Sequence, residues 1–220
     1  MNRNIASTLT GLTVAWGGVL LLLSPADRLL GPPDRLSTKL LEQLVLWILA
    51  GIIAAIVVFW ERQPLASMNL RPFRWSSLAW GLLLAAVMMY VVLPTLTWAL
   101  HAAAIPAFEA GMATALAAPA GLRIIAVITA GVVEDILFIG YAFTRLARLT
   151  GSGWLAAVVA AAAAALLYFP HWGVGPVLAF FVTEAIAVGF FVWRRDLLAN
   201  IVAHVTVDGM ALVVMPWLNG

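Results

Sequence analysis

Long apolar runs separated by short polar stretches make up most of the chain. A bilayer core about 30 Å thick is crossed by a helix of about 20 mostly apolar residues. The runs are continuously apolar and do not alternate with a period of two residues, which favours helices over the strands of a membrane barrel. The pattern therefore predicts an all-α, polytopic bundle of about seven transmembrane helices. They run near Ile5–Ser24, Leu44–Trp60, Leu78–Leu100, Ile124–Phe143, Trp154–Phe169, Val177–Trp193 and Leu197–Leu218.

Two stretches of this pattern leave alternatives open. The first run could be a cleaved signal peptide, but its length and the lack of a small-x-small site before Asp27 favour a retained helix. The Ala-rich stretch His101–Gly121 is weakly hydrophobic, and we interpret it as a non-cytoplasmic connection, part of which could be a re-entrant or surface helix. Residues 1–220 are expected to form one integral membrane domain.

Composition narrows the class of protein. The 220 residues are 64% apolar and 10% charged, whereas soluble domains average about 45–50% and about 25%. This excludes a soluble enzyme, a secreted disulfide scaffold and a disordered chain. A net charge of +2 does not suggest nucleic-acid binding, and the lack of cysteine excludes disulfides, thiolate metal sites and cysteine nucleophiles.

The distribution of Lys and Arg predicts a cytoplasmic N-terminus. In that orientation the cytoplasmic side holds Arg3, Arg62, Arg71, Arg74, Arg145, Arg148, Arg194 and Arg195, and the other side holds Arg28, Arg35, Lys39 and Arg123. The chain shows no organellar signal, and its spans are rich in Ala, Leu and Trp. We therefore expect a multi-pass protein of a prokaryotic plasma membrane.

Ionisable residues inside the predicted spans are the main functional signal. A charge at the bilayer centre costs about 2.5–3.5 kcal/mol on insertion scales, so such residues are usually functional. His204 and Asp208 are four residues apart and share one helix face. Glu134 and His171 can meet side by side if their helices form a hairpin at Gly151–Gly153. Six ionisable groups in the spans are expected to face one another across a polar cavity; they are Glu134, Asp135, His171, Glu184, His204 and Asp208. We predict that four of them, Glu134, His171, His204 and Asp208, line a water-filled cavity that opens to the cytoplasm.

Three ordered motifs resemble those of CPBP intramembrane proteases, the CAAX-processing and bacteriocin-processing group that includes the Rce1-type enzymes. Glu134-Asp-Ile-Leu-Phe-Ile-Gly140 resembles the signature Glu-Glu-x-x-Phe-Arg-Gly, with Asp135 for the second Glu and Ile139 for Arg. Leu167-Tyr-Phe-Pro-His171 corresponds to Phe-x-x-x-His, with Leu for Phe. His204-Val-Thr-Val-Asp208 matches His-x-x-x-Asn/Asp. Residues 122–210 would form the catalytic core.

The resemblance implies a glutamic-type intramembrane endopeptidase that needs no cofactor. Glu134 and His171 would position and deprotonate a water molecule, and His204 with Asp208 would stabilise the oxyanion. Asp135 is assigned a supporting role, and Asp208 could instead orient His204. The expected partners are a membrane-associated peptide or protein substrate and the lipid bilayer.

Structural interpretations compete with these roles. Glu134 with Asp135, or His204 with Asp208, could serve helix packing alone, and His171 could be an interfacial histidine. Glu184 is interpreted as a packing or substrate-cavity residue, His101 as interfacial, and four arginines as topology anchors; these are Arg145, Arg148, Arg194 and Arg195.

Three other functional classes stay open: a proton-coupled transporter, a metal-dependent hydrolase and an inactive scaffold. Buried Glu, Asp and His also carry protons, but no inverted repeat or paired broken helices are visible. The same groups could ligate a divalent ion, although His-Glu-x-x-His is lacking. Ile139 replaces the Arg of the signature, and this replacement is the observation that supports an inactive scaffold.

Overall fold

The computed structural model describes residues 3–23, 30–32 and 35–219, and within these ranges all regular structure is helical. The all-α fold predicted from the apolar runs is therefore confirmed. The N-terminal half contains α1 (Arg3–Leu12), η1 (Thr13–Gly17), α2 (Gly18–Leu23), α4 (Leu36–Ala55), η2 (Ile56–Trp60), η3 (Leu65–Met68), α5 (Trp75–Val87), η4 (Met88–Val92) and α6 (Leu93–Ala102). The C-terminal half contains α7 (Glu109–Leu116), α8 (Ala120–Thr129), η5 (Ala130–Phe143), α9 (Thr144–Thr150), α10 (Gly153–Leu167), α11 (Phe169–Trp172), α12 (Val174–Arg194), α13 (Leu197–Gly209), η6 (Met210–Val214) and α14 (Met215–Asn219).

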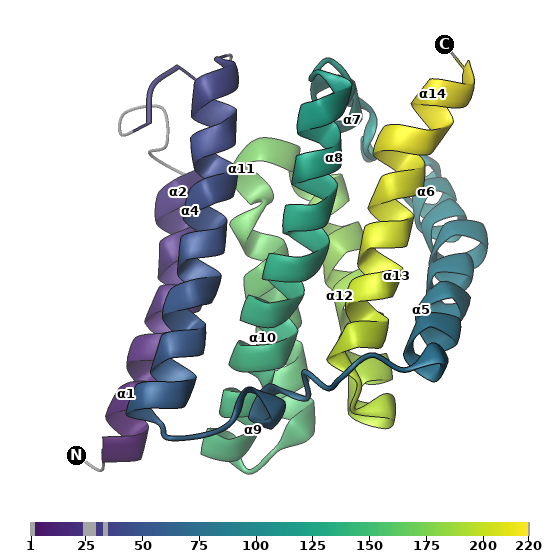
Figure 1. Ribbon diagram of the computed structural model, residues 1–220. Helices are drawn as coiled ribbons and strands as arrows, with labels where there is room; N and C mark the ends of the chain where they lie inside the picture. The colour runs from purple at the N-terminus through teal and green to yellow at the C-terminus, as the bar shows by residue number, and fades with distance from the viewer. Residues whose placement is uncertain (1–2, 24–29, 33–34, 220) are drawn as a thin grey trace.

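The long helical stretches α1–α2, α4, α5–α6, α8–α9, α10, α12 and α13–α14 run in alternating directions, so that α1 begins and α14 ends at opposite ends of the bundle (Figure 1). Five helical stretches are long and apolar enough to cross a membrane; they are Ile5–Leu22, Leu36–Trp60, Trp75–Ala102, Val174–Arg194 and Leu197–Leu218. The other two predicted spans are also helical, within residues 120–150 and within α10. The number of spans and the cytoplasmic position of the N-terminus stay predictions.

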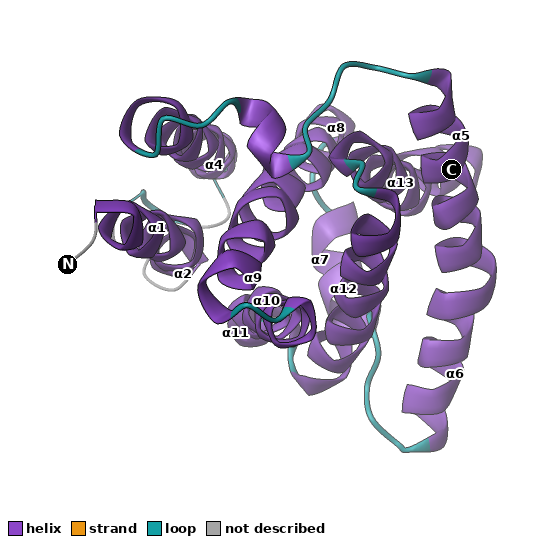
Figure 2. Ribbon diagram, turned by 90° about the horizontal axis from the view of Figure 1, so that it is seen from below, coloured by secondary structure: helices purple, strands orange, loops and turns teal. Residues whose placement is uncertain are grey.

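The continuous helix α8–η5–α9 lies at the centre of the bundle. Its η5 segment contacts η1 and α4 on one side and α10, α12 and α13 on the other. Seen from below, α1, α2 and α4 form one side of the molecule, while α12, α13 and α5 lie on the other (Figure 2). Leu137, Phe138 and Tyr141 belong to the apolar core shared with the N-terminal helices, and Ile139 and Phe143 to the core shared with α10, α12 and α13.

Polar caps fix the tight turns at one end of the bundle. Gly151 ends α9 with a left-handed φ of 66°, and the Ser152 Oγ accepts a hydrogen bond of 3.2 Å from the Leu155 amide. The predicted hairpin turn between α9 and α10 is thus present. Asp196 caps α13 in the same way, accepting a hydrogen bond of 3.3 Å from the Ala199 amide. Its other oxygen accepts a 2.6 Å bond from the Ser77 hydroxyl, which joins α5 to the start of α13.

The stretch His101–Gly121 contains the short helix α7, as one of the interpretations from the sequence suggested. His101 Nε2 and Glu109 Oε1 are 2.7 Å apart, which ties the end of α6 to the start of α7. Backbone hydrogen bonds, together with His101, lower the pKa of the exposed Glu109 carboxyl. Gly111 of α7 lies directly against the Trp172 ring of α11, so this connection packs over the helix that carries His171.

Candidate functional site

Two packed helices position the acidic and histidine side chains of the candidate site. Glu134 and Asp135 lie on η5, and His204 and Asp208 lie on α13, which contacts η5 along its length. The close approach depends on Gly131, because a Cβ at this position would lie 2.9 Å from the backbone nitrogen of Val205. A residue with a side chain at position 131 would push α13 away from η5. Position 131 is one turn from Asp135 and lies against Val205, the neighbour of His204, so the separation would occur at the candidate site.

His204 lies between two carboxylates. Its Nδ1 is 3.0 Å from Oδ1 of Asp135, and its Nε2 is 3.5 Å from Oδ2 of Asp208. Asp135 is buried, whereas His204 and Asp208 are partly exposed. The shorter contact therefore comes from Asp135, and this residue holds the ring orientation more directly than Asp208 does. The second Asp135 oxygen, Oδ2, is buried without a hydrogen-bond partner among the described residues.

Glu134 completes the cluster on the same helix. Its carboxyl group interacts electrostatically with His204, Asp208 and Asp135, and it also interacts with the Tyr168 hydroxyl. η5 is wound as a π-helix, in which each residue turns through a smaller angle than in an α-helix. Adjacent side chains then diverge less than the about 100° expected of an α-helix. This winding brings the Glu134 side chain closer to the face of η5 that carries Asp135, the residue that contacts His204.

Two residues that sequence reasoning left outside the core site also belong to the cluster. Glu184 of α12 interacts electrostatically with Asp135, His204 and Glu134. Tyr168, between α10 and α11, packs its ring against Phe180 with centroids 5.6 Å apart and interacts electrostatically with Glu134. Glu184 had a signal in the sequence, as an acid inside an apolar run. Tyr168 had none, because an interfacial tyrosine at a helix end is common.

The predicted partnership of Glu134 with His171 stays a prediction. The backbone of His171 belongs to α11, but its side chain lies outside the part of the chain that the structure describes. The shared water-filled cavity open to the cytoplasm also stays a prediction. Among the described residues, no three His, Asp or Glu side chains are grouped so as to hold a metal ion.

Ile139 stands where the CPBP signature carries Arg, and the structure explains why its neighbours accept it. The side chain is fully buried and packs in an apolar cluster with Phe143, Val188, Phe191 and Leu197. These neighbours offer no acceptor for a guanidinium, and an Arg here would leave a buried charge unpaired.

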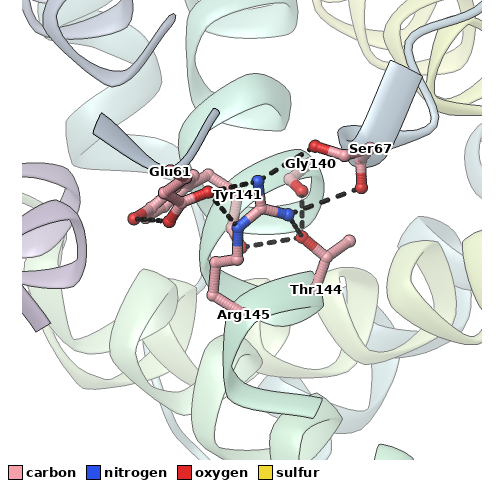
Figure 3. A network of polar contacts seen from close by, with 6 residues as sticks. All are labelled: Glu61, Ser67, Gly140, Tyr141, Thr144 and Arg145. Atoms are coloured by element: carbon pink, nitrogen blue, oxygen red, sulfur yellow. Dashed lines mark hydrogen bonds and ion pairs between the residues drawn. The ribbon is translucent and has the colours of Figure 1, made fainter. Parts of the chain in front are cut away.

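A different arginine, Arg145, is buried nearby in an ion pair, and its interpretation as a topology anchor stays a prediction. Arg145 is 2% exposed, and its Nη2 lies 2.7 Å from Oε2 of Glu61 (Figure 3). It also donates to the Ser67 hydroxyl at 3.0 Å, and the Tyr141 hydroxyl donates to Oε1 of Glu61 at 3.0 Å. The network fixes the loop between η2 and α5 against α9. Sequence reasoning missed it because Glu61 lies 84 residues before Arg145.

Comparison with protein families finds a similarity in the C-terminal half of the chain. The model of the family described as "Type II CAAX prenyl endopeptidase Rce1-like" matches residues 116–210. The resemblance to the CPBP family is confirmed. The matched segment runs from the end of α7 to the start of η6, and it contains Glu134, Asp135, His171, Glu184, His204 and Asp208. Comparison with the curated proteins and with the solved structures finds no match.

Proposed function

We propose that this chain is an intramembrane endopeptidase of the CAAX-protease type, which hydrolyses a peptide bond with a water molecule activated by Glu134 and His171. The supporting observation is that Glu134, Asp135, His204 and Asp208 gather on two packed helices inside the Rce1-like segment. A buried cluster of this kind is costly in a membrane, which favours a catalytic role over a purely structural one.

In the proposed reaction Glu134 is the general base. Its carboxylate accepts a proton from water, and the resulting hydroxide attacks the carbonyl carbon of the scissile bond. The proton then passes to the leaving amine as the tetrahedral intermediate collapses. The Tyr168 hydroxyl, which interacts with Glu134, would help to orient the carboxylate. His171 would hold the attacking water from the opposite helix.

His204 is assigned to the oxyanion. With both ring nitrogens protonated, Nδ1 donates to Asp135, and Nε2 can donate to Asp208 or to the developing negative charge. The 3.5 Å contact with Asp208 is long for a hydrogen bond. It is therefore the contact that a substrate oxygen would replace, while Asp135 keeps the ring in place.

The proposed substrate is a membrane-associated peptide or protein. The family description names a prenyl endopeptidase, which makes an internally quenched, farnesylated peptide the first probe. Purified protein in lipid nanodiscs is expected to cleave it, with cleavage unchanged by EDTA and lost in Glu134→Ala. Glu109→Gln, an exposed acid near the bundle end, is the matched control and should retain activity.

Each competing class gives a different result in this assay. Activity lost in EDTA and restored by one metal, with a stoichiometric ion in metal analysis, would indicate a metal-dependent hydrolase. Full cleavage by Glu134→Ala would overturn the assignment of the base. No cleavage of farnesylated or unmodified peptides, together with proton uptake into proteoliposomes, would indicate a transporter.

A further inference from the structure

A cavity of about 400 Å³ is lined by the start of α8 and by the C-terminal elements η6 and α14. This volume is within the usual range for small-molecule sites. The start of α8 and the end of α14 lie at one end of the bundle, and α9, the helix of Arg145, lies at the other (Figure 1). α8 contributes three residues to its lining, and η6 with α14 contributes the others; the lining residues are Ala120, Arg123, Ile124, Val213, Pro216 and Trp217. None of them belongs to the candidate catalytic cluster.

Arg123 is the one charged residue of the lining. Its Nε is buried without a hydrogen-bond partner among the described residues. A buried donor that is left unpaired is costly, and more so when it belongs to a charged group. The missing partner must be a hydrogen-bond acceptor, and a negative charge suits a guanidinium best.

The remaining walls are apolar and open toward the surroundings of the bundle. Ile124 is 44% exposed and Trp217 is 80% exposed, while Val213 and Pro216 fill the space between them. Trp217 and Arg123 both lie at the ends of predicted spans, where indole rings and arginines reach the headgroup level of a bilayer. A ligand that suits this cavity therefore carries an anionic group beside an apolar chain.

We propose that this cavity binds one anionic glycerophospholipid, with its phosphate on Arg123 and the upper part of an acyl chain against Ile124, Val213 and Trp217. A free phosphate ion would gain only one guanidinium and would bury none of the apolar wall. An acyl chain gains binding free energy with each methylene group that it buries against the apolar wall, which favours the lipid over the free ion. This proposal does not depend on the proposed function.

The bound lipid would connect the two helices that carry the candidate site. α8 continues into η5, which bears Glu134 and Asp135, and η6 follows α13, which bears His204 and Asp208. α8 also contacts η6 and α13 directly. A lipid wedged between α8 and α14 would therefore stabilise the pairing of these helices at the end farthest from the Arg145 network.

The test measures lipid binding to the full chain. Protein purified and delipidated in a mild detergent is titrated with dioleoylphosphatidylglycerol, dioleoylphosphatidylcholine or glycerol 3-phosphate. Native mass spectrometry counts bound lipid, and the thermal unfolding midpoint reports its effect. We expect one tightly held phosphatidylglycerol and a raised midpoint, with weaker binding of the zwitterionic lipid and no shift from glycerol 3-phosphate.

Variants locate the site. Arg123→Gln should weaken phosphatidylglycerol binding by about 10- to 100-fold, because it removes a charge-assisted hydrogen bond to the lipid phosphate. Val213→Trp should fill the cavity and weaken lipid binding while the charge of Arg123 stays in place. Arg71→Gln, an exposed arginine in the loop before α5, is the matched control and should bind as the unchanged chain does.

Three results would overturn the proposal. The first is unchanged phosphatidylglycerol binding by both Arg123→Gln and Val213→Trp. The second is an equal midpoint shift from glycerol 3-phosphate, which would show a plain anion site. The third is equal affinity for the two lipids. If Arg123→Gln fails to fold, Val213→Trp and Arg123→Lys carry the test, and the Lys variant should bind more weakly than the unchanged chain.

Discussion

At the scale of single residues, Glu134 and Asp208 should respond differently to the loss of a carboxylate. Glu134→Gln keeps the size of the side chain but removes the proton acceptor, so turnover should fall by about 10²–10⁴-fold, the usual contribution of general base catalysis. Asp208→Asn supplies an amide donor to the same space and is the other residue type that the His-x-x-x-Asn/Asp pattern allows. It should retain substantial turnover of the farnesylated probe, while Asp208→Ala loses most of it.

Equal tolerance of Glu134→Gln and Asp208→Asn, at equal amounts of folded protein, would show that Glu134 is structural. The chain provides a control for a nonspecific effect of charge loss, because Glu109→Gln removes an exposed carboxylate that pairs with His101 at 2.7 Å, away from the candidate site. That variant should retain normal turnover.

The sequence could predict part of this site and not the rest, for a physical reason. Glu134, His204 and Asp208 stand out because an ionisable group in an apolar span is costly wherever the helix faces. The closer contact of His204 with Asp135 depends on the π-helical winding of η5, and the approach of Glu184 depends on the rotation of α12. Neither winding nor rotation can be determined from an apolar run alone.

At the scale of the helices, the spacing between η5 and α13 should be sensitive to Gly131. Gly131→Ala places a methyl group against the Val205 backbone, so the two helices must separate. Overpacking of this kind costs about 1–3 kcal/mol. It should also lengthen the 3.0 Å contact between Asp135 and His204. We expect a lower thermal unfolding midpoint and reduced turnover of the probe.

Gly189 of α12 provides the matched control, because nothing lies within 4 Å of a Cβ added there. Gly189→Ala should leave the midpoint unchanged or raise it, since Ala is favoured over Gly in a helix by about 1 kcal/mol. A similar effect of both substitutions would mean that Gly131 matters for helix propensity and not for close packing.

The pairing of Arg145 on α9 with Glu61 in the loop after η2 should contribute strongly to stability. Arg145→Met leaves a buried Glu61 carboxylate without its partner, a change that typically costs about 3–5 kcal/mol. Glu61→Gln combined with Arg145→Met removes both charges and should recover most of the lost unfolding midpoint. Arg71→Met, in the exposed part of the same loop, should have little effect. If the double variant is as unstable as the single one, the ion pair is not the source of the stability.

At the scale of the whole molecule, the helical runs and their order could be predicted from apolar length, but the orientation in the membrane rests on charge alone. The loop before α5, the turn after α9 and the turn after α12 lie at one end of the bundle, and the connection that contains α7 lies at the other (Figure 1). The first end holds seven of the described arginines, which are Arg62, Arg71, Arg74, Arg145, Arg148, Arg194 and Arg195. The excess of positive charge predicts that this end faces the cytoplasm.

The lack of cysteine makes this prediction directly testable, because any introduced cysteine is the sole thiol of the chain. Arg71→Cys lies in the exposed loop before α5, and Ala117→Cys lies in the exposed stretch after α7. In intact cells, a membrane-impermeant maleimide should label Ala117→Cys and leave Arg71→Cys unlabelled until the membrane is permeabilised. The reverse pattern would place the N-terminus outside and the Arg145 network on the non-cytoplasmic side. Labelling of both would mean that the two loops lie on one side, and the number of membrane crossings between α5 and α7 would then be even. Because α5, η4 and α6 form one uninterrupted helix between these two positions, we expect the single crossing and the labelling of Ala117→Cys alone.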